Sequence, residues 1–296
     1  MTMRKNGLMF VVLFLMMLVQ SCEEPYFGTD DASESKGNLR VRVFEIDQTP
    51  FVSLTHESTT RGEQAASEVC KRLNFAIYDM EGTRVKQVNQ TSDDKGFGTA
   101  SFQLEEGDYY VVVVGHSSNG NPTMTNPMKI QFNNSLGYSD TYLCSDYVSI
   151  AEEPEEFEVS LDRIVSLCRF VVTDEFPAEV KKMQFYYTGG SGAFDATTGL
   201  GCVNSKQDVK FDVVEGQNQF DLYTFLHDVE GTIHLKVTGL DALGNELHFR
   251  EFDVPMQQNH ITWLSGAFFD GTGSSAMTFT GVTVNTDWEG ETYLTF

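Results

Sequence analysis

Apolar and polar residues alternate with a period of two along most of this chain, which is the pattern of half-buried β-strands. In the first such segment, Leu39, Val41 and Val43 share one face. Arg40 and Arg42 fall on the other face. The same pattern predicts a first series of strands at 72–78, 84–88, 98–104, 108–115, 128–132 and 157–161.

Turn residues separate these segments. Glu106 and Gly107 precede the strand at 108–115, and glycine and Asx residues reverse a chain at little steric cost. Within that strand, the valine run 111–114 is too short and too β-branched for a helix. It suits a strand that is buried on both faces, so we expect it to be central in its sandwich.

A second series of strands is predicted at 166–173, 182–188, 209–214, 219–226, 232–240, 246–254 and 259–264, with a last pair at 277–284 and 292–296. No segment has the period of a long amphipathic helix. Short strands between glycine turns predict an all-β chain built from antiparallel sandwiches. A boundary near Asp162 gives an N-terminal sandwich at 39–162 and a C-terminal sandwich at 163–296.

The N-terminus has the pattern of a secretory leader. Arg4 and Lys5 precede an apolar run at 8–19, which is too short to span a bilayer because a spanning helix needs ~20 residues. A small residue stands directly before Cys22. We interpret residues 1–21 as a lipoprotein signal peptide whose removal leaves Cys22 as the acylated first residue. Apart from this covalent lipid, we expect no cofactor.

Residues 22–38 are acidic and nearly free of aliphatic side chains, as expected of a flexible tether. The whole chain has 20 basic and 43 acidic residues and a formal net charge of −23. Loss of the basic residues of the leader makes this charge more negative still. Because phosphate recognition requires a basic stripe, nucleic acid is not an expected partner.

The remaining cysteines are Cys70, Cys144, Cys168 and Cys202. An even number of cysteines in an exported chain permits two disulfides, in three alternative pairings that the sequence does not distinguish. Free buried thiols are also compatible with the sequence, because a core of this size can be stable without disulfide cross-links.

The sequence contains no motif for catalysis or metal binding. No two of the six histidines have the spacing of a zinc motif such as H-x-x-x-H. The segment 189–192 resembles a nucleophile elbow, but Ala193 stands where that motif needs its second glycine. We therefore interpret this segment as a flexible loop, and we expect neither enzyme activity nor a bound metal.

Aromatic residues are plentiful, with 23 Phe and 11 Tyr. Most must belong to the core, but a few exposed rings could stack on the apolar faces of sugars. Phe185, Tyr186 and Tyr187 are adjacent in a predicted strand, so at least one of them points away from its neighbours. We consider Tyr186 and Tyr187 as contacts for host or bacterial glycans.

Several features occur in an order that matches a known family over the whole mature chain. They are the Ser21–Cys22 cleavage site, the strand from Asn38 to Val43, Arg61 in a polar loop, the segments 72–79, 106–116 and 259–266, and the tail with Trp288. The chain resembles the Bacteroidales fimbrillin superfamily, whose members are type V pilus subunits. It is most similar to the fimbrillin-associated anchor and minor-subunit family.

The resemblance implies two tandem transthyretin-like antiparallel β-sandwich domains with Greek-key connections. It also implies export to the cell outer membrane as a surface-exposed lipoprotein, and assembly with other fimbrial subunits into a fimbrium. In this family, shaft subunits are cut by an arginine-specific protease in a loop after the first strand, and Arg61 matches that position. Anchor members instead keep their lipid and their first strand.

The sequence thus leads to one principal hypothesis and two alternatives. The principal hypothesis is a lipid-anchored anchor, minor or tip subunit that assembles by β-strand complementation and serves surface adhesion. The first alternative is a surface lipoprotein that binds polysaccharides or other glycans. An enzyme ranks third, because no motif supports it.

Overall fold

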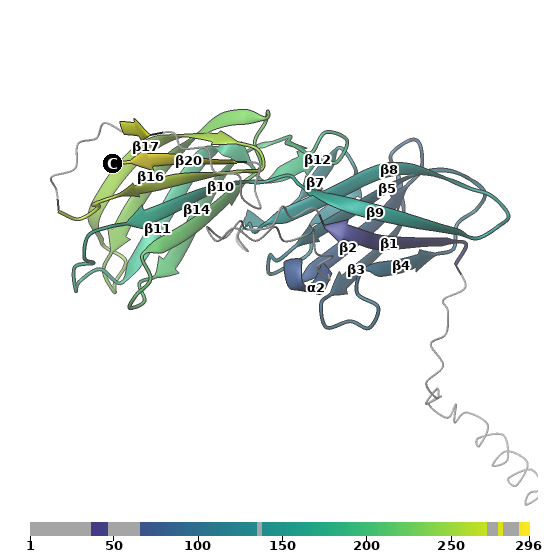
Figure 1. The fold of residues 1–296 in the computed structure, drawn as a ribbon, viewed down its shortest axis with the longest axis horizontal. Helices are drawn as coiled ribbons and strands as arrows, with labels where there is room; N and C mark the ends of the chain where they lie inside the picture. The colour runs from purple at the N-terminus through teal and green to yellow at the C-terminus, as the bar shows by residue number, and fades with distance from the viewer. Residues whose placement is uncertain (1–36, 47–65, 135–137, 271–277, 281–289) are drawn as a thin grey trace, which may run out of the picture. The chain divides into compact units, whose positions relative to one another are not determined.

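The computed structural model describes residues 37–46, 66–134, 138–270, 278–280 and 290–296. The regular secondary structure of the described residues consists of β-strands, as predicted, apart from the short helix α2 (Ala66–Val69). In this part of the chain, no helix is long and apolar enough to cross a bilayer. The described residues belong to one unit of contacts, and Figure 1 labels most of their strands.

The N-terminal part forms one seven-stranded sheet. Its strand order is β3 (Arg84–Thr91), β2 (Arg72–Tyr78), β5 (Gly107–His116), β8 (Thr141–Ile150), β9 (Glu155–Arg163), β1 (Leu39–Ile46) and β4 (Thr99–Phe102). Strands β8 and β9 pair over only two positions, and strands from both ends of the sheet contribute to a single core. The sheet therefore folds over itself into a sandwich around this N-terminal core.

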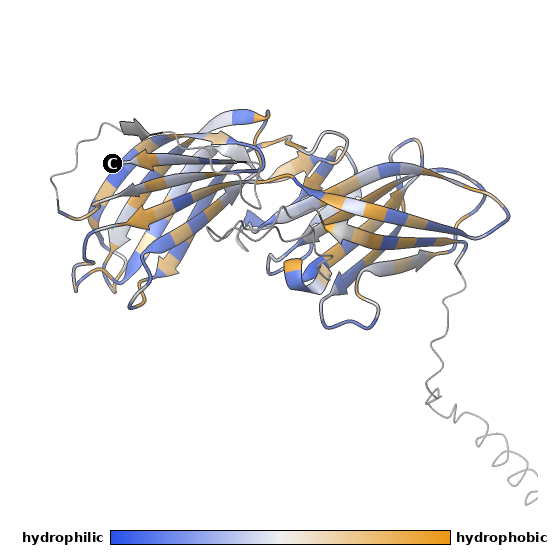
Figure 2. Cartoon of the chain, in the orientation of Figure 1, coloured by the Kyte–Doolittle hydropathy of each residue, from blue (hydrophilic) through white to orange (hydrophobic). Residues whose placement is uncertain are grey.

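Strand β5 is central, as the valine run predicts. It lies between β2 and β8, and its residues from Tyr110 to His116 are all buried. Val111 and Val113 belong to the N-terminal core, whereas Val112 and Val114 face the opposite side of the sheet. Figure 2 shows how most other strands instead alternate between apolar and polar residues.

The C-terminal part packs two sheets around a second core. One sheet has the order β15 (Gln219–Thr224), β10 (Ser166–Val172), β18 (His260–Gly266), β20 (Gly290–Thr295) and β19 (Thr278–Thr280). The other has the order β14 (Asn204–Asp212), β11 (Lys182–Ser191), β16 (Glu230–Leu240) and β17 (Glu246–Gln257). The C-terminal core between them is rich in phenylalanine, with Phe170, Phe185, Phe220 and Phe252 buried together.

A small fourth sheet contains strands from both parts of the chain. Its order is β13 (Leu200–Gly201), β12 (Ala193–Asp195), β7 (Lys129–Gln131) and β6 (Thr123–Asn126). Phe194 of β12 pairs with Ile130 of β7 in antiparallel register. The two parts are therefore joined by backbone hydrogen bonds as well as by side-chain packing.

Behind this small sheet lies a third hydrophobic cluster, the junction core. Phe225 stacks on Phe132 with ring centroids 5.7 Å apart, and it lies 5.1 Å from the ring of Phe194. Val112 and Val114 of β5 complete the cluster from the N-terminal side. The domain boundary that we predict near Asp162 thus falls beside a continuous core, and it stays a prediction.

An ion pair between the buried Arg163 and the partly exposed Asp140 supports the same junction. Arg163 is 6% exposed, and its Nε donates a 2.7 Å hydrogen bond to Asp140 Oδ1. Its Nη2 donates at 2.8 Å to the hydroxyl of Tyr142. Asp140 holds the Arg163 pKa above its ordinary value despite burial. Both charges are compensated, as buried charges must be.

The sheets differ from the prediction in being mixed rather than purely antiparallel. Strand β1 is parallel to β9, and β18 is parallel to both β10 and β20. Periodicity reports which residues face a core but not the direction of the neighbouring strand, so the pattern could not reveal this. The transthyretin-like, Greek-key topology of each sandwich stays a prediction.

Strand β8 was not expected from the sequence. Its first three residues are all buried, whereas its second half alternates from Tyr147 to Ile150 between exposed and buried positions. The pattern changes around Ser145 and Asp146, in the middle of the strand. A single period therefore does not fit the whole segment, although it forms ten paired positions with β5.

The interpretation of segment 189–192 as a flexible loop was wrong. Gly189 and Gly190 lie within β11, at a shift in the pairing register with β14. A Cβ atom on Gly189 would lie 2.3 Å from the carbonyl oxygen of Thr232, and one on Gly190 would lie 1.9 Å from Thr224 Oγ1. These glycines permit close packing of the backbone rather than mobility.

The four described cysteines are free thiols in the structure. Cys70 and Cys168 are buried, and burial raises the pKa of each thiol to about 12. Both therefore behave as small apolar core residues.

A buried histidine makes stability depend on pH. His116 is 0% exposed; its Nε2–H donates to Asn74 Oδ1 at 2.8 Å and its Nδ1 accepts from the Ser118 N–H at 3.1 Å. This geometry requires the neutral ring. Burial, assisted by the charge of Arg72, lowers the His116 pKa from 6.5 to about 4.

We predict that the free energy of unfolding falls by up to ~3 kcal/mol between pH 6.5 and pH 4 through this histidine. In this window the unfolded chain binds a proton at His116 and the folded chain does not, so acid favours unfolding. The measurement is urea unfolding of the wild type and of His116→Gln across this range. The difference in unfolding free energy between the wild type and His116→Gln removes the contribution of the carboxylates, which both proteins share. A difference that stays constant with pH would contradict the prediction.

Candidate interaction site

Strand β1 occupies an internal position in the N-terminal sheet. It runs parallel to β9, with Leu39 opposite Glu155, and antiparallel to β4, with Leu39 also opposite Phe102. Strand β4 pairs with no other described strand. Removal of β1 would therefore leave one edge of β9 unpaired and would detach β4 from the sheet.

The side chains of β1 follow the predicted alternation. Leu39 and Val41 are 0% exposed in the N-terminal core, and Arg40 and Arg42 are exposed. Full burial of a Leu or Val side chain stabilises a fold by ~1.5–3 kcal/mol. Arg42 also forms a 3.1 Å ion pair with Glu158 of β9, but both side chains are about half exposed, so this pair contributes little.

The start of β1 is fixed by hydrogen bonds to two neighbouring segments. The Asn38 side chain donates to the carbonyl of Leu104 and accepts from the Leu104 N–H, both at 2.9 Å. The Asn38 carbonyl accepts a 2.9 Å bond from the N–H of Glu155. The strand is thus held by burial and hydrogen bonds, which a strand of similar pattern could reproduce.

Two predicted site residues, Cys22 and Arg61, lie outside the described residues. Strand β1 ends at Ile46 and α2 begins at Ala66, so Arg61 belongs to the segment between them. Their assignment to lipidation and to proteolytic cleavage stays a prediction.

The structure separates the two predicted glycan contacts, Tyr186 and Tyr187. They point to opposite faces of β11, where Tyr186 is 36% exposed and Tyr187 is 2% exposed. Tyr187 belongs to the C-terminal core, and its hydroxyl donates to the carbonyl of Tyr223 at 2.9 Å. The proposal of both as glycan contacts therefore needs correction, because Tyr187 has no exposed ring face to offer a sugar.

Tyr186 borders a shallow hollow of about 420 Å³ on the outer face of its sheet. Thr188, Lys236 and Glu251 line the hollow with it, together with a hydrogen-bonded pair formed by His234 and Asp253. The Lys206 ammonium lies 5.9 Å from the centroid of the Tyr186 ring. The hollow thus combines one aromatic ring with polar groups of both signs.

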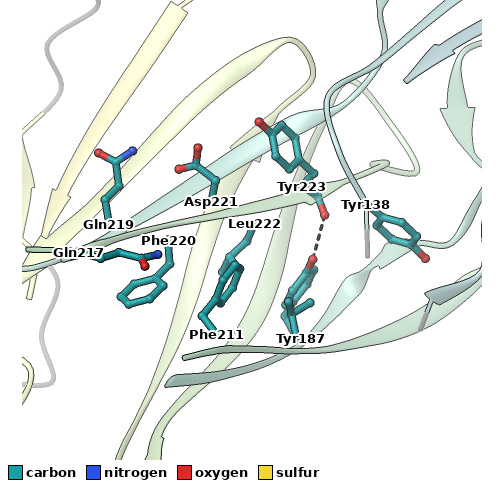
Figure 3. A pocket seen from close by; sticks show the side chains of 10 residues that line it. Tyr138, Tyr187, Phe211, Gln217, Gln219, Phe220, Asp221, Leu222 and Tyr223 are labelled. Carbon is teal, nitrogen blue, oxygen red and sulfur yellow. Dashed lines mark hydrogen bonds between the residues drawn. The ribbon is translucent and has the colours of Figure 1, made fainter. Parts of the chain in front are cut away.

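A second cavity, the edge cleft, lies between β14 and β15 and has a volume of about 510 Å³ (Figure 3). The five consecutive residues from Gln219 to Tyr223 line it from β15, and Val209 and Phe211 line it from β14. The sequence predicted both strands but gave no sign that they end their sheets on the same side of the sandwich.

Across the part of the chain that the structure describes, no three His, Cys, Asp or Glu side chains gather as they would around a metal ion. His234 and Asp253 form a hydrogen-bonded contact on the wall of the hollow. The described residues thus present three features that a partner could contact: an internal first strand, an aromatic hollow and an edge cleft.

One family model matches most of the folded part of this chain. Residues 45–253 match the model of the fimbrillin-A associated anchor proteins Mfa1 and Mfa2. Comparison with curated proteins gives no match.

Several solved bacterial structures are similar to this chain. A candidate adhesin from Bacteroides ovatus has a TM-score of 0.46 and 14% identity, covering 73% of this chain and 81% of that chain. The fimbrial anchor protein Mfa2 from Porphyromonas gingivalis has a TM-score of 0.41 and 11% identity, covering 72% and 80%. A fimbrial assembly protein from Parabacteroides distasonis has a TM-score of 0.38 and 14% identity, covering 77% and 89%.

The assignment rests on the family model, since it spans more than half of the sequence and includes the end of β1, most of the junction core and most of the C-terminal sandwich. The chain belongs to the family of fimbrillin-A associated anchor proteins.

Proposed function

We propose that this protein is a lipid-anchored subunit of a fimbrium, in an anchor, minor or tip position, that joins other fimbrial subunits by β-strand complementation. It acts in surface adhesion and catalyses no reaction. Family membership supports a fimbrial place at the cell surface. The observation that carries the proposal is the internal position of β1, the first described strand of the chain.

Strand β1 is suited to exchange because it contributes buried side chains and two sets of backbone hydrogen bonds, but no described covalent link holds it in the sheet. If cleavage occurs after Arg61, the released fragment includes β1. The unpaired edge of β9, beside the apolar N-terminal core, would then accept a strand from a neighbouring subunit. If the chain is an anchor, β1 stays in place and Cys22 holds the protein in the outer membrane.

We predict that the protein isolated from the cell surface begins at an acylated Cys22 and retains residues 22–61. Mass spectrometry of the mature N-terminus is the measurement. Cys22→Ala should remove the lipid mass and shift the protein out of the membrane fraction, whereas Arg61→Ala should leave the N-terminus unchanged. A mature chain that starts at Gly62 would contradict permanent anchoring and would indicate release of β1.

We also predict that a peptide with the sequence of β1, Leu39–Ile46, stabilises a chain that begins at Gly62. A ligand that binds only the folded state at 100 times its Kd adds ~2.7 kcal/mol to the free energy of unfolding. Thermal unfolding with and without peptide measures the effect.

The controls are two altered peptides. A peptide with Arg42→Ala should still stabilise the truncated chain, because Arg42 is half exposed. A peptide with Val41→Asp should not, because it places a charge in the N-terminal core. Equal stabilisation by both altered peptides would argue against insertion of the strand.

A second candidate function is glycan binding, favoured by the exposed Tyr186 beside the polar hollow. We predict that any binding of the protein to a glycan array falls at least tenfold in Tyr186→Ala. A tyrosine ring that stacks on a base contributes ~1–3 kcal/mol, and a comparable contribution to a sugar supports this magnitude. Thr232→Ala, on the same outer face but outside the hollow lining, is the matched control. An array without signal would remove this candidate.

A further inference from the structure

We propose that the edge cleft between β14 and β15 is an acceptor site for an extended, uncharged segment of a second protein, with apolar residues at alternate positions. The segment pairs with β15 as an added strand. This site lies in the C-terminal sandwich, away from the sheet positions of β1, and the proposal therefore stands or falls separately from exchange of the first strand.

Among the described strands, none pairs with β15 on the side of the cleft. Strand β15 pairs with β10 on one side and is the terminal strand of its sheet among the described strands. The N–H of Val172 donates to the carbonyl of Asn218 at 2.9 Å, which sets the alternation of the antiparallel ladder. The backbone groups of Asn218, Phe220 and Leu222 therefore turn toward β10. Those of Gln219 and Asp221 turn away from it.

One hydrogen bond shows that this free edge faces the cleft. The Tyr187 hydroxyl, which comes from β11 in the opposite sheet, donates to the carbonyl of Tyr223 at 2.9 Å (Figure 3). Backbone groups two residues apart in a strand point to the same side. The backbone groups of Gln219 and Asp221 therefore point to the side of the Tyr223 carbonyl, toward the cleft. The Tyr187 hydroxyl thus occupies the Tyr223 carbonyl at one end of the cleft. The backbone groups of Gln219 and Asp221 remain to pair with an added strand.

The floor of the cleft is apolar. Phe220 and Leu222 point inward from β15 and are buried in the C-terminal core. The apolar surface that stays accessible in the cleft is therefore that of the partly buried Val209 and Phe211 on β14. Phe211 of β14 reaches across the gap, with its ring centroid 5.4 Å from that of Phe220. An added strand places every second side chain against this floor, so its inward residues are apolar.

The charges of the lining determine that the occupant is uncharged. Asp221 is the one charged residue in the lining, and Arg169 neutralises it through two hydrogen bonds of 2.7 and 2.8 Å. The other polar lining side chains at this end are the neutral amides of Gln217 and Gln219. A second copy of this chain is a poor occupant, because each copy carries a net charge of −23.

Strand β15 also lacks three of the devices that protect a sheet edge, namely lysine, proline and a bulge. Natural edge strands are blocked by lysine, proline or a bulge, which prevent pairing with another chain. Residues 219–224 contain no lysine or proline, and β15 pairs with β10 without a register shift. A regular row of donors and acceptors matches an extended peptide better than a sugar, whose hydroxyl groups do not repeat at the spacing of a strand.

The test uses the whole mature protein and two acetylated octapeptides of the same composition. In one, Thr and Val alternate; in the other, four Thr precede four Val. We expect the alternating peptide to bind with a Kd below about 1 mM and to slow amide hydrogen exchange at Gln219 and Asp221 at least tenfold. We expect the block peptide to do neither.

Two changes remove the edge hydrogen bonds while leaving the apolar floor intact. Gln219→Pro deletes an N–H that points away from β10 and should abolish binding, whereas the control Gln219→Thr should retain it. N-methylation of alternate amides of the peptide should also abolish binding. Because this change leaves the protein unaltered, it tests the same hydrogen bonds even if Gln219→Pro does not fold. Equal binding of both peptides, or of the N-methylated peptide, would overturn the proposal. So would protection of Gln219 by maltohexaose in the absence of peptide binding.

Discussion

The structure depends on covering strand β5 on both of its faces. Its valine run places Val111 and Val113 on one side of the sheet and Val112 and Val114 on the other, and all four are fully buried. A sheet with two apolar faces is stable only when each face packs against another layer. The first face is covered by the folded-over end of its own sheet, which contains β1, and the second by the junction core.

This constraint explains why the two parts of the chain form one unit. The junction core takes Phe194 and Phe225 from the C-terminal part, and β12 extends the contact by pairing with β7. The ion pair of Arg163 and Asp140 lies at the same connection. The junction therefore combines side-chain packing with backbone pairing.

Both candidate partner sites would bind a β-strand through backbone hydrogen bonds and apolar packing, but one is filled and the other is open. Strand β1 already fills its position between β9 and β4, so a partner there must replace it. Strand β15 has an open edge above an apolar floor, so a partner there adds to the sheet. The hollow beside Tyr186 differs from both because it offers side chains rather than backbone, and therefore suits a small polar ligand. Tyr187, the sequence neighbour of Tyr186, instead donates a hydrogen bond to the Tyr223 carbonyl at the end of the edge cleft.

The sequence by itself determined the all-β class, the alternation of β1, the central place of the valine strand and, through ordered motifs, the family. These follow from local periodicity and from residue types that the chain carries wherever it folds. Only the tertiary structure decided that β1 is parallel to β9, that the glycines of β11 serve close packing, and that Tyr186 and Tyr187 differ in exposure. Strand direction, edge position and close approach are relations between segments far apart in sequence. No local pattern encodes them, because the alternation of side chains is the same whichever strand lies alongside.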